Sequence, residues 1–133
     1  MNAQLLFNSL DDNERTALFL LLASLDVAYT IHVSEDDTPI RGNALASGNS
    51  DIDRECEEAI IRRLNNGDVW AWAFVRVTAQ AIVNGVLYTG EDCLGGCSYK
   101  NEADFKQPGD YYDDMKHVAL ENLKAAIQKG TNA

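Results

Sequence analysis

An Asn84-Gly85 pair separates two long stretches that are rich in β-branched and aromatic residues. Asparagine and glycine tolerate the positive φ angles of a two-residue hairpin turn, so the pair predicts two antiparallel strands joined by a tight turn. The first strand is expected at residues 69–83. Because both of its faces are apolar near its start, it is predicted to be a central strand covered on two sides. The second is expected at residues 86–99, interrupted around 90–92 and at 95–96 by glycines that indicate a bulge or a close backbone approach.

Further elements follow from alternation and from helix-capping signals. Alternating apolar residues predict another strand at residues 27–33. Three helices are predicted, at residues 10–25, from Ser50 to just before Gly67, and at residues 111–128 after an Asp110 cap. The order α-β-α-β-β-α predicts a single α+β domain over residues 1–133, with a three-stranded, mainly antiparallel sheet packed by helices. The helix at 10–25 is a possible N-terminal addition to it.

The same patterns predict which side chains pack. Trp70 and Trp72 are expected on one face of their strand, with at least one of them buried beneath a helix. In the helix that Ser50 opens, one face is apolar and the other is charged. The apolar face is expected to hold Ile52, Cys56, Ala59, Ile60 and Leu64, and the charged face Asp53, Arg54, Glu57, Glu58 and Arg62. Gly130 is expected to follow the end of the last helix.

The charge balance limits the partners that the chain can have. Among 133 residues there are 21 acidic and 11 basic residues, which gives a net charge of −10. Nucleic acid backbones and anionic membranes repel such a chain, so neither is expected to bind it directly, whereas a protein with a basic surface is a suitable partner. Asp11, Asp12 and Glu14 precede the short apolar run 17–23. That is the wrong charge for a signal peptide and too few apolar residues for a membrane span, so a cytoplasmic location is expected.

The three cysteines, Cys56, Cys93 and Cys97, do not form a recognisable metal or catalytic motif. A zinc site would need His32 or His117 from separate elements and a tighter cysteine spacing. A cysteine nucleophile with His117 as base is formally possible, but nothing in the local sequence would activate the thiol. We therefore expect three reduced thiols, no metal, no cofactor and no enzymatic activity.

Two acidic segments carry the whole net charge. Residues 34–58 have eight acidic and two basic residues, and residues 91–116 have seven acidic and three basic residues. The first includes a long surface loop at 34–50 with a turn at Arg41-Gly42-Asn43, and loops of this length are often functional. If the two segments share a face, they could imitate a phosphate track. The candidate partner-binding residues are Glu35, Asp36, Asp37, Asp51, Asp53, Glu57, Glu58, Tyr111, Tyr112, Asp113 and Asp114.

Four short segments carry a resemblance to known proteins. They are Arg41–Gly48 (RGNALASG), Gly67–Ala73 (GDVWAWA), Leu94–Tyr99 (LGGCSY) and Gly109–Met115 (GDYYDDM). Over roughly residues 27–127 the chain resembles a family of small uncharacterised proteins of phages, plasmids and integrated mobile elements. The resemblance implies an accessory protein of a mobile element in a bacterial cell. It implies no catalytic residue.

Together these features predict a non-enzymatic protein that binds and inhibits a host nucleic-acid-targeting defence complex, of the anti-CRISPR or anti-restriction type. The alternatives are a structural or assembly protein of a phage or plasmid and, third, a small hydrolase or transferase. A homodimer is also expected, because a three-stranded sheet has two open edges and the first helix is largely apolar.

Overall fold

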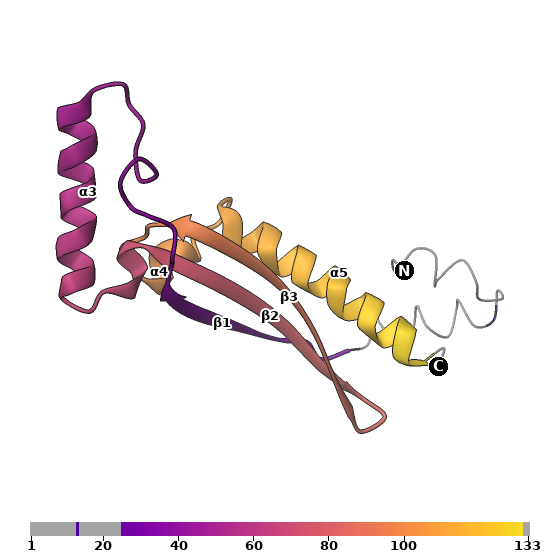
Figure 1. Ribbon diagram of the computed structural model, residues 1–133. Coiled ribbons are helices and arrows are strands. Elements are labelled where there is room, and N and C mark those ends of the chain that lie inside the picture. The colour runs from indigo at the N-terminus through magenta and orange to yellow at the C-terminus, as the bar shows by residue number, and fades with distance from the viewer. Residues whose placement is uncertain (1–12, 14–24, 132–133) are drawn as a thin grey trace. The chain divides into compact units, whose positions relative to one another are not determined.

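The computed structural model describes residue 13 and residues 25–131. These residues form a mixed α+β fold with a three-stranded antiparallel sheet in the order β1-β2-β3 (Figure 1). The elements in chain order are β1 (Ala28–Glu35), α3 (Ser50–Asn65), a 3₁₀ turn η1 (Val69–Ala71), β2 (Ala73–Val83), β3 (Val86–Cys97), α4 (Glu102–Phe105) and α5 (Tyr111–Thr131). The predicted fold class and strand order are confirmed. The helix predicted at 10–25 falls almost wholly outside the described residues.

The chain divides into two compact units. Among the described residues, a terminal unit comprises residues 13, 25–30, 77–92 and 114–131, and a central unit comprises residues 31–76 and 93–113. Strands β1, β2 and β3 each contribute residues to both units. That the chain folds as one domain stays a prediction.

The predicted hairpin is confirmed at the position of its turn. Asn84 and Gly85 have φ angles of 52° and 79°, and they join the end of β2 to the start of β3. Both angles lie in the left-handed region that this two-residue turn requires. The turn sets the register of the two strands, and it places Phe74 opposite Gly95 and Arg76 opposite Cys93.

β2 is the central strand, as predicted, but one of its faces is not covered. Its buried face consists of Ala73, Val75, Val77, Ala79, Ala81 and Val83. On the other face, Phe74 is 38% exposed and Ile82 is 69% exposed. The prediction of cover on both sides is therefore wrong along much of the strand, because apolar character on both faces does not by itself supply a second covering layer.

The strand was predicted to begin at residue 69, but β2 begins at Ala73. Residues 69–71 form η1, and the Asp68 carboxylate caps this turn by accepting a hydrogen bond from the Trp70 N–H at 3.1 Å. The cap turns the chain before the extended segment starts, so the two tryptophans enter different surroundings. Trp72 is 3% exposed and packs with Ile60, whereas Trp70 is half-buried.

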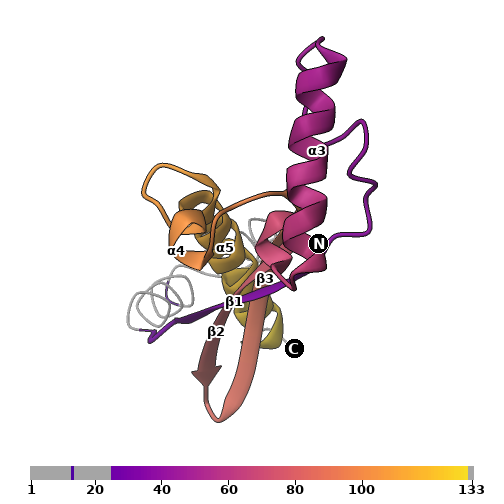
Figure 2. The same ribbon diagram turned by 90° about the vertical axis from the view of Figure 1, so that its left-hand side faces the viewer.

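Helix α3 ends as predicted but begins with a different cap. The side chain of Asn49, rather than Ser50, accepts hydrogen bonds from the N–H groups of Asp51 and Ile52. Gly67, with φ at 86°, follows the helix in the expected left-handed conformation. Of the predicted apolar face, Ile60 is buried, whereas Ile52 is 50% exposed. The loop between β1 and α3 runs back alongside the helix (Figure 1, Figure 2).

In the terminal unit, α5 packs on β3 without intervening side chains at one point. The buried apolar residues of α5 in this unit recur every fourth position, at Met115, Ala119, Leu123 and Ile127. A Cβ atom on Gly90 would lie 2.7 Å from the backbone carbon of Asn122, so this glycine marks the close approach that the sequence indicated. The predicted stop at Gly130 is wrong, since α5 continues to Thr131 and Gly130 instead makes room for the Tyr88 ring.

Among the described residues, no helix combines the length and the apolar character that crossing a bilayer requires.

Candidate protein-binding surface

Several of the candidate acidic residues hold the backbone of the central unit rather than face a partner. The Asp53 carboxylate accepts hydrogen bonds from the N–H and the hydroxyl of Ser47, at 3.1 and 2.7 Å. The Asp113 carboxylate accepts one from the Gly109 N–H at 3.3 Å. Each of these bonds fixes a loop end near the start of a helix, so Asp53 and Asp113 have a structural use.

The predicted position of Glu57 is the one that the structure contradicts most clearly. It was expected on the charged face of its helix, but it is 7% exposed. Its carboxylate accepts a hydrogen bond from the Gly42 N–H at 2.7 Å and lies 3.9 Å from the Arg41 guanidinium. The turn at residues 41–43 folds onto α3, and its backbone N–H needs an acceptor once water is excluded. Glu57 supplies that acceptor.

Asp36 links the end of β1 to β3. Its carboxylate accepts hydrogen bonds from the N–H groups of Thr38 at 2.6 Å and Gly96 at 2.9 Å. The bonds from Thr38, with a smaller contribution from Gly96, hold the pKa of Asp36 below its ordinary value of 3.8. A Cβ atom on Gly95 would lie 2.6 Å from the same carboxylate, so the glycine leaves it the space it occupies.

This carboxylate gives the fold a specific pH dependence. Because the pKa of Asp36 is lowered on folding, its contribution to stability is present above about pH 4 and is lost as the pH falls through the lowered pKa. We expect the parent protein to lose more stability than Asp36→Asn between pH 5 and pH 3, as measured by urea unfolding midpoints at each pH. Parallel pH profiles for the two proteins would contradict this role.

The remaining candidate residues differ in exposure. Glu35, Asp37, Asp51, Glu58 and Asp114 are exposed, the last of them in the terminal unit. Tyr111 is 57% exposed and is available as an anchor. Tyr112 is not, because it is half-buried with its ring 5.5 Å from that of Phe105. Aromatic packing of the short helix α4 against the start of α5 removes Tyr112 from the surface.

The open face of the sheet in the central unit forms two shallow hollows that meet at Phe74. One, of about 380 Å³, is lined by Ser34, Glu35, Asp36, Asp37 and Phe74. The other, of about 180 Å³, is lined by His32, Val33, Ser34, Phe74 and Arg76. We call these eight residues the Phe74 surface. It combines an exposed aromatic ring, carboxylates over one hollow and a guanidinium over the other.

Sequence reasoning found the carboxylates of this surface but missed Phe74 and Arg76. Alternation along the strand does place both on one face. The signal for exposure was Arg76 itself, because an arginine is rarely buried without a partner. The apolar residues before Arg76 indicated a strand covered on both sides, and that indication was given more weight.

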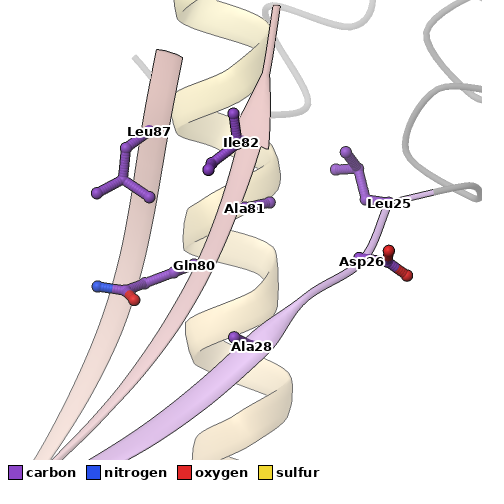
Figure 3. A pocket seen from close by; sticks show the side chains of 7 residues that line it. All are labelled: Leu25, Asp26, Ala28, Gln80, Ala81, Ile82 and Leu87. Atoms are coloured by element: carbon purple, nitrogen blue, oxygen red, sulfur yellow. The ribbon is translucent and has the colours of Figure 1, made fainter. Parts of the chain in front are cut away.

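A hollow of about 510 Å³ in the terminal unit is mainly apolar and has few polar groups that could bind a ligand. It is lined by Leu25, Asp26, Ala28, Gln80, Ala81, Ile82 and Leu87 (Figure 3). The two polar side chains among them, Asp26 and Gln80, point in opposite directions. Small-molecule sites use polar groups that converge on the ligand, and this hollow lacks that arrangement.

The thiols show no activated nucleophile or metal centre among the described residues. The Cys97 thiol donates a hydrogen bond to the Ala73 carbonyl oxygen at 3.3 Å, and burial raises its pKa to about 11. A thiol with so high a pKa carries almost no thiolate at neutral pH. Within the described parts of the chain, no three His, Cys, Asp or Glu side chains gather as metal ligands would.

The segments that carry the family resemblance interlock within the central unit. The Arg63 guanidinium donates to the Asp68 carboxylate at 2.8 Å and to the Tyr99 carbonyl oxygen at 2.5 Å. Trp70 and Tyr99 pack edge to face, with ring centroids 6.4 Å apart, and both rings contact Phe105. Burial is the main cause that raises the pKa of Tyr99 to about 12. Packing thus accounts for Asp68, Trp70 and Tyr99, which belong to two of the four segments.

The chain matches no protein-family model, no curated protein and no solved structure. Functional inference therefore depends on the residues described above.

Proposed function

We propose that this protein is a non-enzymatic accessory protein of a bacterial mobile element that acts in the cytoplasm of its host. It binds a basic surface of a nucleic-acid-targeting defence complex, of the restriction or CRISPR type, and inhibits it. The observation that supports the proposal best is the Phe74 surface, where a 38% exposed aromatic ring lines one hollow together with the acidic residues Glu35, Asp36 and Asp37.

The chemistry of this surface suits a protein partner. Exposed aromatic residues supply much of the affinity at protein interfaces, and charged residues around them speed association and select the partner. A net charge of −10 adds long-range attraction to any strongly basic cleft. An acidic protein held in such a cleft competes with the phosphate backbone of the nucleic acid.

A second candidate function, an assembly protein of a phage or plasmid, is favoured by a different observation. In the terminal unit Ile82 and Leu87, which line the same hollow, are 69% and 58% exposed. Contiguous apolar residues at a surface indicate association. The two functions differ in salt dependence: inhibition through carboxylates weakens steeply with salt, whereas apolar assembly does not.

Charge reversal at the Phe74 surface tests the proposed function. Glu35→Lys/Asp37→Lys is the test variant, and Glu55→Lys/Glu121→Lys is a control that reverses the same number of exposed acidic residues outside the candidate set. We avoid Asp53 and Glu57 because they hold loops. In cells with an active restriction or CRISPR system, the parent and the control should raise transformation by a targeted plasmid. The test variant should give at least about tenfold fewer transformants.

The abundance of each variant is measured in the same cells, so that loss of protein is not read as loss of function. Full protection by Glu35→Lys/Asp37→Lys at equal abundance would remove this surface from the mechanism. The assembly function would then be preferred.

A further inference from the structure

We propose that the edge of β1 in the central unit and the Phe74 surface together bind an extended segment of a partner protein that carries Lys or Arg side chains. The segment adds as a further strand beside β1. This inference rests on the proposed function and specifies how the partner is held.

The first observation is the edge itself. β1 is an outer strand in the order β1-β2-β3, and its central-unit part is Ile31–Glu35. Within this stretch His32, Ser34 and Glu35 are exposed, and Ile31 and Val33 are half-buried. Edge strands are commonly protected by proline or lysine, and β1 contains neither. Such an edge is a template for strand addition.

The second observation is the position of the hollows. Side chains alternate between the two faces of a strand, so every second side chain of an added strand lies on the open face with His32 and Ser34. Ser34 and Phe74, which are exposed on this face, line both hollows of the Phe74 surface. An added strand could therefore form backbone hydrogen bonds with β1 and place its side chains in the hollows at the same time. Backbone pairing supplies affinity and the hollows supply selectivity.

The third observation is the charge, which selects the occupant. Residues 31–38 contain three acidic residues, Glu35, Asp36 and Asp37, and no Lys or Arg. A second copy of this chain offers no Lys or Arg in residues 31–38 to pair with these acids, and two copies in parallel would place like charges side by side, which is destabilising. A segment with Lys or Arg near the larger hollow meets complementary charge.

Short blocked peptides of known composition serve as probes for this site. The first is an eight-residue peptide of alternating valine and lysine, the second has glutamate in place of lysine, and the third is the lysine peptide methylated on alternate backbone nitrogens. Each is titrated into the ¹⁵N-labelled full-length protein at low salt, and binding is followed by amide chemical shifts. The lysine peptide should shift the amides of residues 31–37 and Phe74. It should bind at least about tenfold more tightly than either of the other two peptides.

Variants of the protein separate the two parts of the site. Phe74→Ala and Glu35→Lys/Asp37→Lys should each weaken binding of the lysine peptide by about tenfold or more, whereas Glu55→Lys/Glu121→Lys should change it less than about twofold. The amide spectrum of each variant shows whether it is folded. Equal affinity for the lysine and glutamate peptides, or no loss on backbone methylation, would overturn the inference. Shifts confined to α3 would overturn it as well.

The peptide experiment tests strand addition and the plasmid experiment tests the inhibitory function, so either hypothesis can be wrong while the other stands. If the lysine peptide does not bind while Glu35→Lys/Asp37→Lys still abolishes protection in cells, strand addition is wrong and the proposed function stands. If the peptide binds as expected while the parent gives no protection, the binding mode stands and the inhibitory function is wrong.

Discussion

Replacing Trp72 with alanine is expected to lower the free energy of unfolding by about 3–5 kcal/mol. The side chain is 3% exposed and packs with Ile60 and Ala71. Its indole N–H donates a hydrogen bond to the Thr38 carbonyl oxygen at 2.7 Å. The substitution leaves a cavity beneath α3 and removes the partner of a carbonyl in the loop after β1. Since small domains are stable by only about 5–15 kcal/mol, much of the protein should unfold at moderate urea concentrations.

Phe74→Ala is the matched control. It also removes an aromatic ring, only two positions further along the chain, but the Phe74 side chain is 38% exposed. It should cost about 1 kcal/mol or less. Urea unfolding followed by far-ultraviolet circular dichroism measures both variants without relying on tryptophan fluorescence. Equal unfolding midpoints for Trp72→Ala and the parent would contradict the burial of Trp72. The same comparison shows that Phe74 can be altered in the binding experiments without loss of the fold.

The parts of the fold that sequence predicted are those that local chemistry decides. Asn84-Gly85 and Gly67 were predicted correctly because each position requires a positive φ angle that few residues tolerate. The helix at Tyr111 was predicted from Asp110, whose carboxylate does accept a hydrogen bond from the Tyr111 N–H. These signals lie within a few residues of the structure that they determine.

The parts that were missed depend on contacts between distant residues or on very short elements. The residues of η1 were predicted as strand because they begin a continuous apolar run rich in β-branched and aromatic residues, and the Asp68 cap that forms the turn is a single residue. α4 has four residues, too few to show helical periodicity. Both are decided by one capping side chain, and such a signal is easily outweighed by the pattern around it.

The candidate site was predicted in its composition but not in its geometry. Sequence identified Glu35 and Asp37 as acidic surface residues, and both are exposed. The sequence could not show that Glu57 differs from them. The Glu57 carboxylate accepts a hydrogen bond from the N–H of Gly42, which lies fifteen residues away in the chain. An acidic residue that accepts backbone hydrogen bonds and one that faces solvent look the same in sequence. The distinction follows from the path of the loop.

Replacing Gly90 with alanine is expected to destabilise the terminal unit by about 3 kcal/mol, at the upper end of the usual cost of overpacking. The added Cβ would lie 2.7 Å from the backbone carbon of Asn122, and closer still to backbone atoms of Ala119 and Leu123. Helix backbone cannot rotate away as a side chain can, so β3 and α5 must separate. Their separation opens the buried row of α5, in which Ala119 and Leu123 are fully buried.

Gly95→Ala is the matched control in the same strand. There the added Cβ meets the Asp36 carboxylate at 2.6 Å, and a carboxylate can move aside at the cost of its hydrogen bonds. We expect a loss of about 1 kcal/mol, the usual net contribution of one or two such bonds. Urea unfolding midpoints and the melting temperature measure both variants. If Gly90→Ala were as stable as the parent, β3 and α5 could not approach as closely as described. If the two glycine variants lost equal stability, backbone contact at Gly90 would be no more rigid than a surface carboxylate.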